Sequence, residues 1–186
     1  ALKNYQKSLE FRPGNIQALS GLIGCHLCLE NSAQAEDNLQ QVLVSAKTLD
    51  DYARIIDTLL VFDQHPRAME VLSTAESRLP DIPAKFYVET ARPLLKNHKT
   101  EQANFWLQKA ITKATPQDNI LIMIADFVMD FDEAIAYEYA QRALEQENTG
   151  QAHVLLGVLE SKRDNKAASK KHFREAEHIA RQTKDE

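Results

Sequence analysis

The chain has 186 residues, of which 44% are hydrophobic and 26% charged, and its formal net charge is −5. This acidic balance argues against a surface that neutralises nucleic-acid phosphates. The longest strongly apolar run, 120–131, is interrupted by two aspartates and falls short of the roughly 20 residues that span a bilayer. With only 5 glycines and 6 prolines for tight turns, an all-α chain is predicted.

A short pattern of side chains recurs along the chain. It consists of a small residue, a large apolar residue four positions later, and a small or aliphatic residue three positions after that. Successive occurrences begin 34, 33, 35, 33 and 33 residues apart. The spacing places each set on one helical face, where the small residue lets a neighbouring helix approach. Each set therefore predicts one packing helix, and the sets begin at Ala1, Ala35, Ala68, Ala103, Ala136 and Ser169.

A second stripe precedes every set after the first, and it predicts a partner helix. Polar breaks such as 30–32, 96–99 and 163–165 separate the two helices, so the repeating unit is a helical hairpin. The stripes are Leu19/Leu22/His26, Tyr52/Ile55/Leu59, Tyr87/Thr90/Leu94, Ile120/Met123/Phe127 and His153/Leu156/Glu160.

In chain order, the pattern predicts a single helical-repeat domain over 1–186. Residues 1–13 form the second helix of a truncated repeat, so further repeats are expected upstream of Ala1. A polar tail over 182–186 is expected to end the domain at a natural boundary. The complete repeats are predicted at 14–46, 47–80, 81–113, 114–146 and 147–181.

A hairpin of about 34 residues with this signature, and with proline near the unit boundary, resembles the tetratricopeptide repeat (TPR). The clearest match is the last unit, where Leu156-Gly157 and Phe173/Ala176 stand at the family's leucine-glycine and aromatic/alanine positions. The first full unit departs most, with His26 at a position that is usually aromatic. The resemblance implies a right-handed superhelical solenoid of stacked antiparallel helix pairs, in which the first helices line a concave groove.

Catalytic and metal-binding patterns are weak. Cys25 and Cys28 lie three residues apart inside a predicted helix, whereas structural zinc usually takes four ligands and redox pairs usually sit at a helix start. His172, Glu175 and His178 are spread too far around a helix to hold one ion. There is no glycine-rich phosphate loop and no recognisable nucleophile set, so the chain is predicted to be no enzyme and to carry no cofactor and no metal.

The resemblance also implies which residues face a partner. In the second and third units these residues are charged and of mixed sign, and in the fourth and fifth they are almost all apolar. Two alternatives stay open: the charged set is a plain solvated face, or the apolar set is internal packing with the register off by one. The charged set is Asp50, Arg54, Asp57, Lys85, Glu89, Arg92 and Lys96, with Leu60 among them. The apolar set is Leu121, Ile122, Ala125, Val128, Met129, Val154, Leu155 and Val158.

One TPR subclass grips the C-terminal carboxylate of its partner with lysine, asparagine and arginine side chains. The corresponding paired positions here are Ser20/Gly24, Ala53/Asp57 and Val88/Arg92. These residue types do not supply such a clamp, so binding of this kind is not predicted.

The predicted function is a non-catalytic scaffold that binds a protein or peptide segment, extended or helical, in the concave groove. The first alternative is a regulatory or targeting appendage of an enzyme encoded upstream of Ala1. The second is helical-repeat RNA binding, which the net negative charge disfavours. A homo-oligomer through the unpaired first helix is a further open alternative, although truncation would create the same exposed face.

Overall fold

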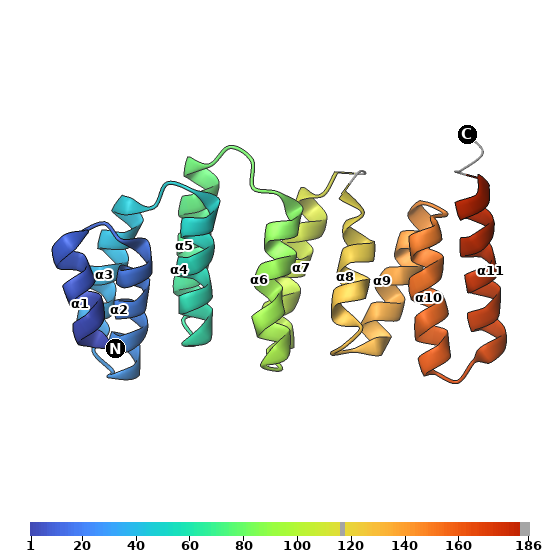
Figure 1. Cartoon of the computed structure of the whole chain (residues 1–186), viewed down its shortest axis with the longest axis horizontal. Helices are drawn as coiled ribbons and strands as arrows, with labels where there is room; N and C mark the ends of the chain where they lie inside the picture. The colour runs from blue at the N-terminus through green and yellow to red at the C-terminus, as the bar shows by residue number, and fades with distance from the viewer. Residues whose placement is uncertain (116–117, 183–186) are drawn as a thin grey trace. The chain divides into compact units, whose positions relative to one another are not determined.

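A computed structural model describes residues 1–115 and 118–182 (Figure 1). Regular structure in these residues consists of eleven α-helices without any β-strand, so the prediction of an all-α chain is confirmed. Most of the predicted polar tail, 183–186, lies outside the described residues. The chain divides into two compact units, Ala1–Ile82 and Pro83–Glu186, each with its own core.

The first unit is built from five helices. Helix α2 packs against α3, and α4 packs against α5. Helix α1 and helix α4 both contact α2, so α2 is the centre of the unit. Its helices are α1 (Leu2–Phe11), α2 (Ile16–Cys28), α3 (Ser32–Ser45), α4 (Leu49–Val61) and α5 (His65–Arg78). Among its fully buried side chains are Leu19, Ile23, Tyr52, Ile55 and Leu72.

The second unit contains the six remaining described helices. The pairs α6 with α7, α8 with α9 and α10 with α11 make its most extensive contacts, and α8 also contacts α6 and α10. Its helices are α6 (Ala84–Lys96), α7 (Thr100–Lys113), α8 (Ile120–Val128), α9 (Glu133–Gln146), α10 (Gly150–Lys162) and α11 (Lys166–Gln182). Trp106, Tyr87, Leu107 and Ile124 are buried at its core.

Polar side chains fix where several of these helices begin. The Thr48 hydroxyl accepts from the backbone N–H of Asp51 at 3.2 Å, and the Asp51 carboxylate accepts from the backbone N–H of Thr48 at 2.9 Å. This reciprocal arrangement is a capping box that starts α4. Burial pushes the pKa of Asp51 upward, but the hydrogen bonds from Lys47 and Thr48 outweigh it and lower that pKa.

Four of the helix pairs in the described residues share the same turn. A residue with φ of 58° to 60° follows the first helix, and the backbone N–H of the next residue reaches a carbonyl five positions back. One such bond joins Gln64 N to Leu59 O at 2.8 Å. This is the Schellman arrangement that satisfies free carbonyls at a helix end. The left-handed residues are Glu30, Asp63, His98 and Asp164.

The pair α8–α9 departs from this pattern. Helix α8 has 9 residues, whereas α4, α6 and α10 each have 13. Its turn closes with a bond from Asp132 N to Val128 O at 2.8 Å, and Asp132 then caps α9 through the N–H groups of Ala134 and Ile135. The different turn accompanies a different register for the buried face of α8.

Burial follows most of the predicted stripes. The stripes of α4, α6 and α10 are buried in full, and so are the sets on α3, α5, α7 and α9. The exceptions are His26 and Met123, which are half-buried, Phe173, which is exposed, and the set on α1, in which Ala1 is exposed and Tyr5 and Ser8 are half-buried. In α8 Ile124 is fully buried and the neighbouring Met123 is not, so the predicted stripe of this helix is only partly right.

A search of the described helices for bilayer-spanning segments finds none of sufficient length and apolar character.

Candidate functional site

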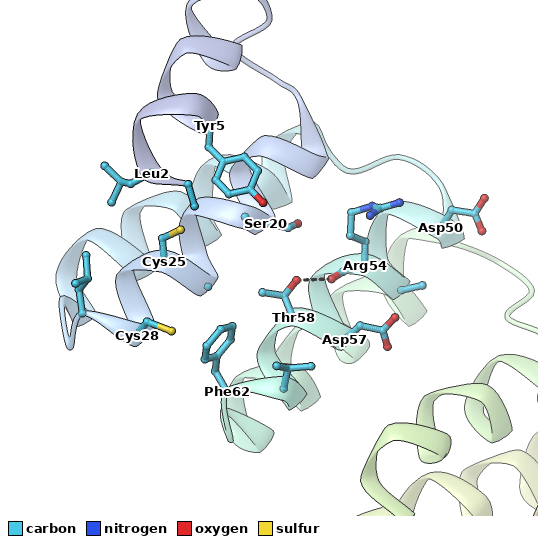
Figure 2. A pocket seen from close by; sticks show the side chains of 16 residues that line it. Leu2, Tyr5, Ser20, Cys25, Cys28, Asp50, Arg54, Asp57, Thr58 and Phe62 are labelled. Carbon is cyan, nitrogen blue, oxygen red and sulfur yellow. Dashed lines mark hydrogen bonds between the residues drawn. The ribbon is translucent and has the colours of Figure 1, made fainter. Parts of the chain in front are cut away.

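A groove of about 920 Å³ lies between α1, α2 and α4 of the first unit, and we call it the unit-1 groove (Figure 2). Helix α2 forms one wall and α4 the opposite wall, while α1 closes one side. Three of the predicted partner-facing residues, Asp50, Arg54 and Asp57, line the groove together. The spacing of four and three residues along α4 brings these side chains to one helical face.

The charged part of the unit-1 groove is exposed to solvent. Asp50, Arg54 and Asp57 are all exposed, so they can contact a partner without leaving the protein core. The hydroxyl of Thr58 donates to the carbonyl oxygen of Arg54 at 2.8 Å, which the dashed line in Figure 2 marks. This bond uses only the backbone of Arg54 and does not engage its guanidinium.

The other end of the unit-1 groove is apolar. Leu29 is 59% exposed and Val61 is 61% exposed, and both line the groove beside Phe62. The Phe62 ring lies so close to α2 that a Cβ added at Gly24 would be 2.8 Å from its Cε2 atom. Glycine at this position therefore gives the ring its place against α2. Exposed apolar side chains that gather in one groove are typical of surfaces that bind other molecules.

Helix α1 contributes an aromatic side chain to the unit-1 groove. The ring of Tyr5 lies against α2, where a Cβ added at Gly21 would come within 2.4 Å of the Cζ atom of Tyr5. No residue with a side chain larger than glycine fits at this position unless the ring moves. The close approach of Tyr5 and Gly21 thus determines how α1 closes the groove.

A buried hydroxyl lies in the wall of the unit-1 groove between Tyr5 and Arg54 (Figure 2). The side chain of Ser20 is on α2, and the residue is 2% exposed. Its Oγ atom has no hydrogen-bond partner among the described residues. A buried hydroxyl that lacks a partner costs about 1–3 kcal/mol. A polar group of a bound chain that reaches Ser20 would remove this cost.

The two cysteines also line the unit-1 groove, and both are free thiols, with Cys25 half-buried and Cys28 exposed. Within the described residues, no group of three or more histidine, cysteine or carboxylate side chains is arranged to hold a metal ion. His172 is in contact with His153 instead, with their Nδ1 atoms 2.9 Å apart. Burial and the neighbouring His153 lower the pKa of His172.

The predicted charged residues of α6 belong to the second unit and are all exposed. Lys85 and Glu89 form an ion pair at 3.4 Å along the helix. The guanidinium carbon of Arg92 lies 4.7 Å from the centre of the Phe127 ring, so this side chain also takes part in the contact of α6 with α8. Lys96 lies in the last turn of α6.

The predicted apolar set is split between core and surface. Leu121, Val128 and Leu155 are buried, as the alternative of internal packing expects. Ile122 and Met129 are half-buried, and Val154 is 44% exposed. Ile122, Val154 and Leu155 line a second groove, of about 990 Å³, in the second unit. The two remaining members of the apolar set are Ala125, which is buried, and Val158, which is half-buried. Leu60, which was predicted with the charged set, is also buried.

Several residues of the unit-1 groove were not predicted to face a partner. Tyr5, Gly21 and Phe62 line the groove because the rings of Tyr5 and Phe62 pack against α2. The spacing of residues along a helix does not predict contacts of this kind. A signal did exist for Ser20 and Gly24, because the sequence resemblance aligns them with the paired positions of the carboxylate-binding TPR subclass. The residue types at those positions exclude that clamp, although the positions themselves line a groove.

These features define an all-α protein built from helical hairpins. Its solved structural neighbours include YrrB, a TPR protein with an unusual peptide-binding site, at 13% identity and a TM-score of 0.46, with 96% of this chain and 93% of that chain covered. A MamA structure (MSR-1 C2) is 15% identical with a TM-score of 0.45, covering 90% and 98% of the two chains. A TPR protein from Parabacteroides merdae ATCC 43184 is 17% identical with a TM-score of 0.42, covering 96% and 70%.

No protein-family model matches the sequence, and no curated protein matches it either. The predicted fold of antiparallel helix pairs is confirmed by the helices of the described residues, which pair in chain order.

Proposed function

We propose that this chain is a non-catalytic scaffold that binds a segment of another protein, with the unit-1 groove as a principal binding site. The observation that carries the proposal is the combination, in one groove, of exposed charged side chains, exposed apolar side chains and the buried, unpartnered Ser20 hydroxyl. The unpartnered hydroxyl and the exposed apolar side chains cost free energy in the isolated chain, and a bound partner chain can use them together with the charged side chains.

The groove suits a segment with one apolar anchor and a polar portion. The anchor packs between Leu29, Val61 and Phe62, where most of the binding free energy is expected because hot spots lie in well-packed pockets from which water is excluded. The polar portion runs toward Arg54, where a carboxylate of the partner would pair with the guanidinium. A backbone or side-chain polar group of the same segment would reach the hydroxyl of Ser20.

The same proposal extends to the predicted partner-facing residues of the second unit. On α6, Lys85, Glu89, Arg92 and Lys96 are accessible for polar contacts. On α8 and α10, the accessible members of the apolar set would contact the partner, and the buried members would support them from beneath. The accessible apolar members are Ile122, Met129 and Val154, and the supporting members are Leu121, Val128 and Leu155. We also propose that the five complete repeats and residues 1–13 form one helical-repeat domain.

The test begins with a random peptide library displayed on phage and selected on the purified chain. Peptides that are enriched are then synthesised, and their affinity is measured by fluorescence anisotropy for the wild type and three variants. Ser20→Ala, Arg54→Ala and Val61→Asp change the hydroxyl, the charged end and the apolar end of the groove. Each is expected to weaken binding, with Val61→Asp weakening it by about tenfold or more because it places a charge in the apolar contact.

Matched controls place the same changes outside the groove. Val44 on α3 is 81% exposed, so Val44→Asp repeats the apolar-to-acid change without touching the groove. Glu70 on α5 is exposed, so Glu70→Ala repeats the removal of a charged side chain. The proposal is wrong if selection enriches no peptide sequence, or if the enriched peptides bind the groove variants and the controls with equal affinity.

A further inference from the structure

The second unit carries a groove of about 990 Å³ between α8, α10 and α11, and we call it the unit-2 groove. Its floor is apolar: Ile122 and Met123 project from α8, Val154 from α10 and Ile179 from α11. Val154 is 44% exposed, and the other three are half-buried. Three different helices therefore present apolar surface to the same space.

The rim of the unit-2 groove is acidic. Asp118, Asp126 and Glu147 line it and are exposed. The lining among the described residues contains no lysine, arginine or histidine. None of the three carboxylates takes part in an ion pair with another described residue. Asp118 accepts hydrogen bonds from the N–H and hydroxyl of Thr115, which leaves its negative charge uncompensated.

Acidic and apolar side chains lie close together along the α8 wall. Ile122 and Asp126 are four residues apart on α8, so they lie on one side of the helix, and Asp118 lines the groove from the segment just before α8. On the opposite side of the groove, Glu147 precedes α10 and Val154 lies one to two turns into it. An apolar strip bounded by negative charge is therefore present on both walls.

We infer that the unit-2 groove binds an amphipathic helix of a partner protein whose apolar side is flanked by lysine or arginine. Helices bind grooves of this kind through apolar side chains at helical spacing, and complementary charge at the rim selects the partner and its orientation. Gly150, Ala176 and Ala180 line the groove with small side chains, which lets a helix approach closely. This inference rests on the proposed function, because it gives the chemical class of partner for one surface of the same scaffold.

The test uses two synthetic amphipathic helices labelled with fluorescein. The first is built from leucine and lysine, and the second has glutamate in place of every lysine. Anisotropy titrations of the purified chain at low and at physiological salt are expected to show binding of the lysine peptide alone, with affinity that falls as salt rises. Val154→Asp and Asp126→Lys are each expected to weaken this binding by about tenfold.

The controls separate the groove from the net charge of the protein. Glu101 on α7 is exposed, and Glu101→Lys changes the net charge by the same amount as Asp126→Lys. Val44→Asp on α3 matches Val154→Asp. Both controls are expected to bind the lysine peptide like the wild type. Circular dichroism confirms folding, and Asp126→Lys, which changes an exposed side chain, decides the test if Val154→Asp loses helicity.

Several outcomes overturn the inference. Equal loss of binding in Glu101→Lys and Asp126→Lys would mean that the peptide responds to overall charge. A second such outcome is a lower sedimentation coefficient for Val154→Asp than for the wild type, while the lysine peptide fails to dissociate the wild-type assembly. That result would assign the groove to a second copy of the chain. Loss of lysine-peptide binding in a form extended beyond Glu186 would assign it to the protein's own following segment.

The two proposals fail in different ways. If the lysine peptide does not bind while phage-selected peptides still distinguish Val61→Asp from Val44→Asp, the inference about the unit-2 groove is wrong and the proposed function stands. If the lysine peptide binds as expected and no selected peptide depends on the unit-1 groove, the unit-2 groove is a binding surface and the assignment of the first groove is wrong.

Discussion

The two grooves are built from the same kind of helix pair but differ in charge. The unit-1 groove has an arginine between two aspartates and an open apolar end, whereas the described lining of the unit-2 groove carries carboxylates without any basic side chain. Both rest on buried small and large residues at the same helical spacing. The comparison shows that the buried pattern sets the hairpin, while the exposed positions between the buried ones set what each groove can bind.

The largest expected effect comes from removing one core side chain in each unit. Leu72 on α5 and Leu107 on α7 are fully buried, and Leu→Ala at such sites costs about 2–5 kcal/mol because it leaves a cavity. In a protein whose helix pairs contact mainly their neighbours, the damage is expected to stay local at first. Leu72→Ala should therefore weaken binding to the unit-1 groove, and Leu107→Ala should leave that binding unchanged.

Chemical denaturation followed by circular dichroism measures the loss of stability in both variants. Peptide titrations at low denaturant concentration then show which groove is affected first. If each variant weakens binding to both grooves to the same degree, the chain unfolds as one cooperative unit and the separation of the two grooves does not hold.

A smaller effect is expected from adding one methyl group at a glycine in each unit. The Cβ of Gly21→Ala would lie 2.4 Å from the Tyr5 ring, so the ring must move and the unit-1 groove must change shape. Overpacking of this kind costs about 1–3 kcal/mol. The Cβ of Gly150→Ala would lie 3.6 Å from its nearest neighbour, which is ordinary contact. Alanine at such an unstrained position is expected to stabilise the chain by up to about 1 kcal/mol, because it restricts the unfolded state.

Thermal unfolding of the two alanine variants tests this difference. Gly21→Ala should lower the melting temperature and alter peptide binding to the unit-1 groove, while Gly150→Ala should keep or raise it. A Gly21→Ala variant with unchanged binding and stability would show that Tyr5 does not close the groove as the structure places it.

The hairpins could be predicted from the sequence because burial follows a fixed spacing. The small and large residues of α5 and α7 and the stripe of α4 are buried as predicted, and the capping pair Thr48 and Asp51 marks a helix start. The charged positions predicted on α4, Asp50, Arg54 and Asp57, lie on an exposed face of the helix for the same reason, whereas Leu60 is buried.

The register of α8 could not be predicted because its turn is different. The positions on α8 were predicted by counting back from α9, which assumes the turn that the other described helix pairs share. Helix α8 is shorter, and the turn that follows it has no left-handed residue. Its buried face therefore includes Leu121 and Ile124, and Ile122 is the one α8 residue predicted to face a partner that lines the unit-2 groove. The rim carboxylates and Ser20 were missed because their roles depend on what other helices bring beside them.

The smallest expected effect is a response to pH that belongs to the second unit. On α10, the Nε2 atom of His153 is 2.8 Å from Asn148 Oδ1, and its Nδ1 atom is 2.9 Å from Nδ1 of His172 on α11. Burial, and then the charge of His153, lower the pKa of His172. Glu160 and Glu175 act in the opposite direction and Lys171 in the same one, and together they do not cancel the shift.

A lowered histidine pKa means that the unfolded chain binds a proton at a higher pH than the folded chain does. The free energy of unfolding therefore falls as the pH drops below about 6.5, the ordinary value for histidine, and stops falling once the folded side chain is also protonated. The contact between α10 and α11 should weaken in this window, and with it the binding of the lysine peptide to the unit-2 groove. His172→Gln keeps a hydrogen-bonding group without the titration, so it should reduce the pH dependence of unfolding measured by denaturant titration. The part that stays is expected from His65 on α5, because burial lowers the pKa of that side chain as well. If the free energy of unfolding of His172→Gln depends on pH as steeply as that of the wild type, the titrating group lies elsewhere. The pair His153–His172 would then give the two grooves no different response to acid.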